Sequence, residues 1–194
     1  MTYSRMSIFL TDFITKELNY DEEKKEIIAY SIENIIVQLG GFLLIVAVSF
    51  VFEALIPASV AAIFGGLLRK VSGGFHFDSP LKCLFFGTAV YTLIGIFINK
   101  YLLFTVFVNY SFLFLILSFV LVFCFAPQDS PAKPIISLSF KRKLKITSLS
   151  IMIVSTIIYF VLNSNVLKLS IVLGIFYQSL TLIPILNNKG GVQE

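Results

Sequence analysis

Long apolar stretches separated by short polar segments dominate this chain. A helix that crosses a bilayer needs about 20 mostly apolar residues, because each residue rises about 1.5 Å and the hydrocarbon core is about 30 Å thick. We predict a transmembrane helix in each of six stretches: residues 35–52, 58–68, 83–98, 101–125, 146–162 and 169–186. The second is short, so we expect it to extend back to Ala54 or to be shielded by neighbouring helices. The predicted fold is an all-α, polytopic membrane protein.

Residues 5–19 carry a different, amphipathic pattern, in which apolar positions recur at the spacing of one helix face. That face holds Met6, Phe9, Leu10, Phe13, Ile14 and Leu18. The opposite face is polar and holds Thr11, Asp12, Lys16 and Glu17. The pattern is typical of a helix at the membrane surface, and it fits a helix packed on another protein helix equally well.

Composition agrees with a membrane protein and limits the chemistry. Of the 194 residues, 57% are hydrophobic and 13% charged, and the mean hydropathy is +0.92, which predicts one integral-membrane domain over residues 1–194. The single histidine and two distant cysteines do not form a metal-ligand set, so we expect neither a metal nor another cofactor. The first residues lack the apolar core and cleavage site of a signal peptide, which indicates a retained N-terminus.

Charge distribution predicts the orientation in the membrane. All but Lys100 and Lys168 of the 15 Lys and Arg residues fall on the side that holds both termini, the segment 69–82 and the segment 127–145. Basic residues favour the cytoplasmic side, so we predict cytoplasmic N- and C-termini in a plasma membrane. The net charge of +4 then follows from topology, and neither a nucleic-acid partner nor a recognition fold is indicated. The segment 127–145 is expected to be a basic loop that contacts anionic lipid.

Polar chemistry gathers in the segment 69–82 and at Cys83, directly after it. His76 and Cys83 would lie about 10 Å apart on one unbroken helix, so the chain must turn if they are to meet. Gly73 and Gly74 permit such a turn, and Ser79 followed by Pro80 is typical of a helix start. The sequence therefore suggests a nucleophilic cysteine with a histidine base. The alternative is an inert, packed thiol and a solvated histidine.

The position of Cys83 favours the reactive form of the thiol. It falls in the first turn of the predicted helix, near the cations Arg69, Lys70 and Lys82, and both features stabilise a thiolate. A cytoplasmic location would keep the thiol reduced. Cys124 lies in an apolar run, where we expect it to be packed deep in a span with no cation nearby.

Three motifs together resemble the accessory gene regulator B (AgrB) family of membrane peptidases. The first comprises Arg69, Gly74, His76 and Cys83, the second is FAPQDSPAKPI with the basic residues after it, and the third is GIFYQSLTLIPIL. The resemblance implies a cysteine endopeptidase that cuts an AgrD-like propeptide near its C-terminal end through a thioester on Cys83, with His76 as the base. The thioester then cyclises to a thiolactone or lactone quorum-sensing peptide.

The resemblance also implies roles for Arg69 and Gly74, in substrate binding and loop shape respectively, although Arg69 fits a simple membrane anchor almost as well. An orienting residue for the histidine is not identified, and the candidates are Glu33, Gln38, Asp78 and Ser79. At the start of its span, Glu33 also fits a headgroup-level carboxylate. A non-enzymatic transporter or export scaffold is the main alternative function. The oligomeric state is left open, with a homodimer as one possibility.

Overall fold

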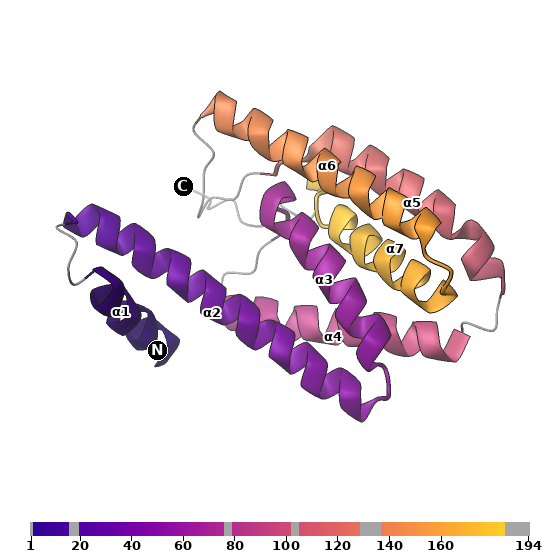
Figure 1. Ribbon diagram of the computed structural model, residues 1–194, viewed down its shortest axis with the longest axis horizontal. Helices are drawn as coiled ribbons and strands as arrows, with labels where there is room; N and C mark the ends of the chain where they lie inside the picture. Colours follow the sequence, from indigo (N-terminus) through magenta and orange to yellow (C-terminus); the bar gives the residue numbers. More distant parts are fainter. Residues whose placement is uncertain (1, 16–19, 76–78, 102–104, 129–136, 185–194) are drawn as a thin grey trace.

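The computed structural model describes residues 2–15, 20–75, 79–101, 105–128 and 137–184. These residues form seven helices and no strand (Figure 1). The helices are α1 (Thr2–Thr15), α2 (Glu22–Val51), α3 (Leu55–Ser72), α4 (Pro80–Tyr101), α5 (Thr105–Phe125), α6 (Leu138–Val161) and α7 (Asn165–Leu180). The all-α, polytopic fold predicted from the apolar stretches is confirmed.

Within the described residues, five helices (α2 to α6) are long and apolar enough to cross a membrane. The stretch 58–68 lies inside the 18-residue helix α3, which begins at Leu55, so the expected extension toward Ala54 is confirmed. The sixth predicted span corresponds to α7, whose 16 residues cover only about 24 Å, less than the hydrocarbon core. The number of spans and the orientation of the termini therefore stay predictions.

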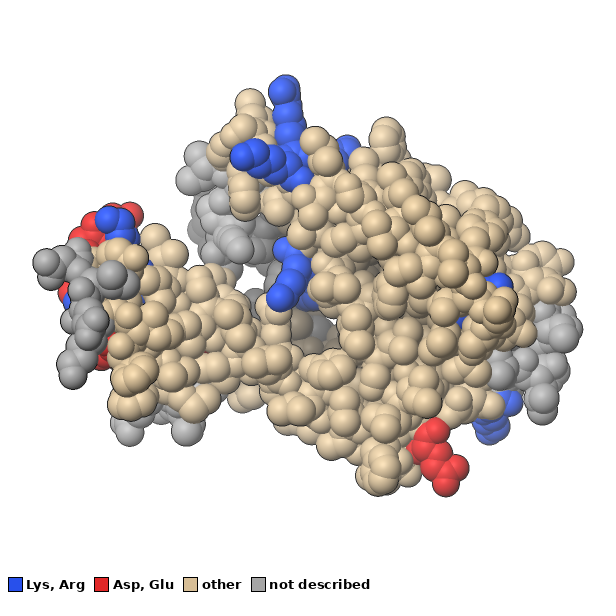
Figure 2. Space-filling model, viewed as in Figure 1, with Lys and Arg blue, Asp and Glu red and all other residues tan. Residues whose placement is uncertain are grey.

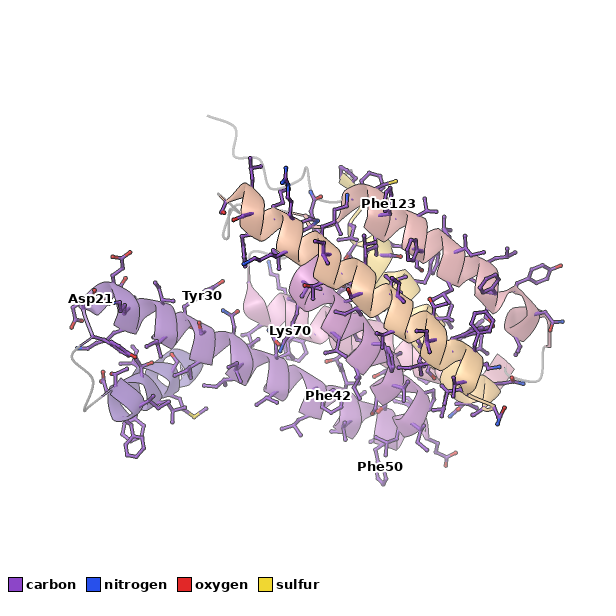
Figure 3. All side chains as sticks on the ribbon, turned by 45° about the horizontal axis from the view of Figure 1, so that its top comes forward. Asp21, Tyr30, Phe42, Phe50, Lys70 and Phe123 are labelled. Atoms are coloured by element: carbon purple, nitrogen blue, oxygen red, sulfur yellow. The ribbon has the colours of Figure 1, made fainter. Side chains whose placement is uncertain are left out.

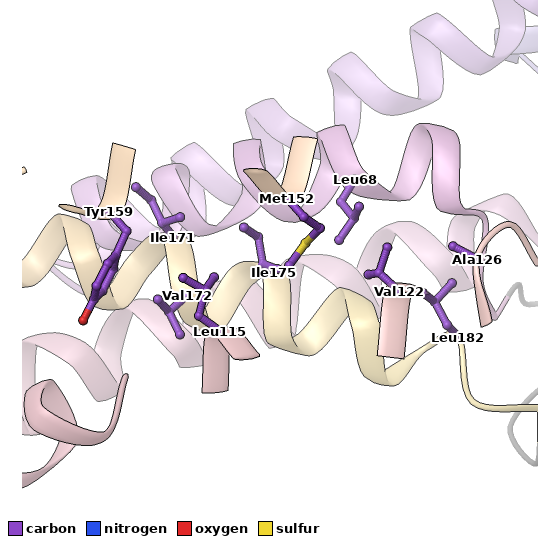
Figure 4. Packing of buried hydrophobic residues seen from close by; sticks show 10 residues of the cluster. All are labelled: Leu68, Leu115, Val122, Ala126, Met152, Tyr159, Ile171, Val172, Ile175 and Leu182. Atoms are coloured by element: carbon purple, nitrogen blue, oxygen red, sulfur yellow. The ribbon is translucent and has the colours of Figure 1, made fainter. Parts of the chain in front are cut away.

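Helix α7 is the centre of the bundle and packs on α3, α4, α5 and α6. Its face supplies Ile171, Val172 and Ile175 to the main core, to which the other helices add Leu68, Leu115, Val122, Met152 and Tyr159 (Figure 4). A methyl group on Gly174 would overlap the carbonyl of Ala61, so the α3 and α7 backbones pass in direct contact. Small residues at such crossings are how membrane helices approach closely. Protein neighbours thus surround this short helix on several sides.

The first two helices form an arm beside the bundle (Figure 1). Helix α2 has 30 residues, with Asp21 near one end and Phe50 near the other (Figure 3), and α1 packs along it. The predicted polar face of α1 is only partly right. Thr11 is buried with Ser7 and Thr15, whereas Phe9 and Phe13 are exposed, because the small hydroxyl side chains occupy the helix contact and leave the large apolar ones outward.

Charged side chains collect on the arm and near the start of α6, while uncharged residues cover most of the face in Figure 2. Helix α6 begins at Leu138, with Ser137 as its N-cap. The cluster Lys141, Arg142, Lys143 and Lys145 therefore lies in the first turns of a helix, inside the segment 127–145 that we had expected to be a loop.

Candidate active site

The connection between α3 and α4 depends on two consecutive glycines. Gly73 has φ of 70° and Gly74 has φ of 129°, a region of backbone space that L side chains rarely adopt. A Cβ at Gly74 would also lie 2.5 Å from Thr181 Oγ1 and 3.2 Å from Gln178 Nε2. The glycine turn is therefore present as the sequence predicted, and it is pressed against the end of α7.

Backbone hydrogen bonds hold this connection on both sides. The Gln128 N–H donates to the Ser72 carbonyl at 2.8 Å, and Gly73 forms an isolated parallel bridge with Gln128. The Phe75 N–H donates to the Thr181 carbonyl at 3.0 Å. The start of the α3–α4 connection is therefore held between two segments, one that follows α5 and one that follows α7.

Cys83 lies where the sequence placed it, in the first turn of a helix that begins at Pro80. Its backbone N–H donates to the Ser79 carbonyl at 3.2 Å, the bond expected of a residue one turn into a helix. The residue is half-buried and its thiol is not part of a disulfide. It is therefore close to a helix N-terminus and available for chemistry.

The guanidinium of Arg69 joins the turn, the thiol and α7. Its Nη2 donates to the Phe75 carbonyl at 2.6 Å and to Cys83 Sγ at 3.6 Å. Its Nη1 donates to Gln178 Oε1 at 3.4 Å. A positive charge thus lies directly beside the thiol, more closely than a membrane anchor would require.

Gln178 is a residue of this cluster that the sequence reasoning missed. It is fully buried, and its Nε2 donates to the Gly73 carbonyl at 2.8 Å and to Ser72 Oγ at 3.4 Å. The available signal was an amide side chain near the end of a mostly apolar helix, since polar residues at membrane depth are usually functional.

The other predicted site residues are less well placed or lie outside the described residues. His76 and Asp78 fall in 76–78, which the structure does not describe. Helix α2 passes the start of α4, where a Cβ on Gly41 would lie 3.7 Å from Leu84 Cγ. Gln38 is one turn before that contact and exposed, and Glu33 is half-buried further along. Among the described residues, no group of three or more His, Cys, Asp or Glu side chains could hold a metal ion.

The accessory gene regulator B family model matches residues 7–182, a range that includes Arg69, Cys83 and Gln178. The chain belongs to this family. An AgrB-like protein of Clostridium perfringens strain SM101 is 31% identical over 94% of this chain and 92% of its own length. AgrB-like protein 2 of strain 13 is 30% identical over the same shares, and an AgrB-like protein of Clostridium acetobutylicum is 25% identical over 79% of this chain and 72% of its own. No solved structure matches the chain.

Membership of the AgrB family associates the chain with the processing of accessory gene regulator quorum-sensing peptides. The match of the family model extends from α1 to just beyond α7, so it covers all the helices of the described membrane architecture.

The second cysteine corrects one expectation. Cys124 is exposed, not packed deep in a span, and lines an open depression of 460 Å³ that Lys141, Arg142 and Lys145 also line. The prediction that it has no cation nearby is wrong. Position 124 is next to the last residue of α5, and the start of α6 brings the basic cluster beside it.

Proposed function

We propose that the protein is a membrane cysteine endopeptidase that cuts an AgrD-like propeptide near its C-terminal end, with Cys83 as nucleophile and His76 as base. The observation that carries this proposal is the Arg69 guanidinium, 3.6 Å from Cys83 Sγ at the start of α4. A thiolate, not a thiol, attacks a carbonyl, and a neighbouring cation and a helix N-terminus both stabilise it.

His76 completes the proposed pair by taking the thiol proton. It belongs to the connection between Phe75, which is bonded to Arg69, and Ser79, which is bonded to Cys83. The ends of this short connection are therefore attached to groups around the thiol. Because the connection is short and both of its ends are held near the thiol, we expect a histidine at position 76 to stay close enough to act as the base.

The reaction then proceeds in two acyl transfers. The Cys83 thiolate attacks the scissile carbonyl, the C–N bond breaks, and the His76 imidazolium protonates the leaving amine, which leaves a thioester on Cys83. A thiol or hydroxyl within the bound propeptide gives its proton to His76 and attacks the thioester. The ring closes, and the C–S bond breaks to return the Cys83 thiolate. A site at the membrane boundary limits competing hydrolysis.

Arg69 and Gly74 have distinct parts in this proposal. Arg69 stabilises the thiolate and can also attract carboxylates of the propeptide, because its guanidinium is positively charged and its planar group of N–H donors matches a carboxylate. Gly74 lets the connection pass close to Thr181. Gln38 remains a candidate for orienting His76, because α2 contacts the start of α4 one turn away.

The decisive experiment is propeptide processing by variants of the two catalytic residues. Cys83→Ser and His76→Ala should each lower cleavage by at least about a hundredfold, because the first removes the nucleophile and the second its base. Cys124→Ser is the matched control and should cleave normally. Processing is read by mass spectrometry of the peptide made in co-expressing cells. Retained cleavage in Cys83→Ser at normal protein levels would favour an export scaffold instead.

A further inference from the structure

We propose that Gln178 is a positioning residue that holds the Arg69 guanidinium against the Cys83 thiol. The inference rests on the proposed role of Cys83 as nucleophile. Gln178 lies 109 positions from Arg69 in the sequence, on the last full turn of α7, and its side chain is completely buried. Burying an amide among apolar helices is costly unless its polar atoms are paired, so the bonds that it makes explain why the position tolerates it.

The hydrogen-bond partners determine which way the amide faces. The Gly73 carbonyl, 2.8 Å from Nε2, can only accept a hydrogen bond, so the NH2 group must point toward it. The Arg69 Nη1 group, 3.4 Å from Oε1, can only donate, so the amide oxygen must point toward it. Both requirements are met by one orientation and violated by the flipped one. The amide is therefore a directional link between the glycine turn and the arginine.

The hydrogen bond from Arg69 to Gln178 also restricts Arg69 Nη2, the atom that contacts Cys83 Sγ. A guanidinium is planar and rigid, so contacts on two different nitrogens restrict its orientation more than one contact does. Gln178 holds Nη1, while the Phe75 carbonyl holds Nη2 at 2.6 Å. With both contacts present, Nη2 also faces Cys83 Sγ at 3.6 Å. Loss of the amide would leave the guanidinium free to rotate about the Phe75 contact and away from the thiol.

A purely structural role for Gln178 makes a different prediction. If it only fastened the turn through Gly73 and Ser72, its loss would displace Cys83 and reduce access to the sulfur at every pH. If it acts through Arg69, its loss reduces the thiolate fraction near neutral pH and leaves the fully deprotonated thiol as reactive as before. The effect should also disappear when Arg69 is already absent.

The experiment is alkylation of the purified full-length protein by iodoacetamide across a pH series. A Cys124→Ser background leaves Cys83 as the single thiol. Gln178→Met is nearly isosteric and removes all three hydrogen bonds. Its alkylation rate at pH 7 should fall on the order of tenfold, since a hydrogen bond to a charged group contributes about that factor, while the plateau rate at high pH is retained. Arg69→Met should show the same loss, and the double variant no further loss.

Ser179→Ala is the matched control. Ser179 is equally buried on the same helix, but its hydroxyl donates a hydrogen bond to the Phe176 carbonyl of that helix and not to the site. It should alkylate like the parent. An unchanged rate at pH 7 in Gln178→Met, a reduced plateau at high pH, or a further loss in the double variant would each overturn the proposal. If Gln178→Met does not fold, Gln178→Asn replaces it, because the shorter side chain withdraws the amide by one methylene. Its alkylation rate at pH 7 should fall by the same factor. An alkylation rate equal to that of the parent would contradict the proposal.

The readout uses no propeptide, so it separates the two proposals. Alkylation can show that Gln178 acts through Arg69 even if Cys83→Ser still processes peptide, an outcome that would sink the peptidase assignment alone. Conversely, Cys83→Ser can abolish processing while Gln178→Met alkylates normally, an outcome that would remove only the positioning role.

Discussion

At the scale of single residues, the site depends on side chains that meet across large distances in the sequence. Arg69 of α3 touches Cys83 of α4 and Gln178 of α7, and Gly74 has no room for a side chain because Thr181 lies against it. Local patterns predicted the glycine turn and the helix start at Pro80. They did not predict Gln178, because an isolated glutamine has no periodicity that indicates its partner.

Gly74→Ala should destabilise the protein by about 1–3 kcal/mol, because the methyl group meets Thr181 and the backbone conformation is unfavourable for alanine. Thermal unfolding in detergent measures the change, and processing should fall with it. Gly87→Ala is the control, since a Cβ there meets nothing within 4 Å. Adding Thr181→Ala should restore part of the loss by removing the overlap. Equal stability of Gly74→Ala and Gly87→Ala would contradict this account.

At the scale of helices, α7 combines a short length with a central place. It has 16 residues but contacts four other helices, and it brings Gln178 to the turn that precedes Cys83. Its closest contact is with α3, where Gly174 faces Ala61. The same two helices carry Arg69 and Gln178, so their spacing sets the distance between these side chains.

Gly174→Ala should separate α3 from α7 and cost about 1–3 kcal/mol of stability, as over-packing of a tight contact usually does. Unfolding temperature and the Cys83 alkylation rate at pH 7 should both decrease. Gly66→Ala, on α3 and so on the partner helix of this contact, is the matched control because its Cβ would meet no atom within 4 Å. That control should be neutral or gain up to about 1 kcal/mol from helix propensity. Parental stability of Gly174→Ala would refute the close contact.

At the scale of the whole molecule, the ends of the helices form two groups. The ends of α3, α5 and α7 meet at one end of the bundle, through bonds of Ser72 with Gln128 and of Phe75 with Thr181. At the other end, the Asn99 side chain in the last turn of α4 donates to the Glu53 carbonyl in the turn between α2 and α3. This turn lines an open depression together with the start of α7. The helix ends joined by these contacts therefore lie at two opposite ends of the bundle.

Labelling of single cysteines tests which end is cytoplasmic. In a Cys83→Ser, Cys124→Ser background, Asn163→Cys should react with a membrane-impermeant maleimide on intact cells, because position 163 is exposed between α6 and α7 at the end predicted to be outside. Ser139→Cys, exposed at the start of α6, should react only after permeabilisation. The reverse pattern would place the Cys83 end outside the cell and contradict the predicted orientation.

The sequence by itself determined the helical membrane class, most helix positions, the glycine turn and the place of Cys83 at a helix start. These features depend on local hydropathy and on the conformational preferences of residues close in the chain. Only the tertiary structure decided that Gln178 joins Arg69, that Cys124 lies exposed beside a basic cluster, and that α1 turns its small hydroxyl residues inward. These features follow from how separate helices pack. A helix that is apolar on all its faces has no sequence pattern that indicates which face contacts which neighbour.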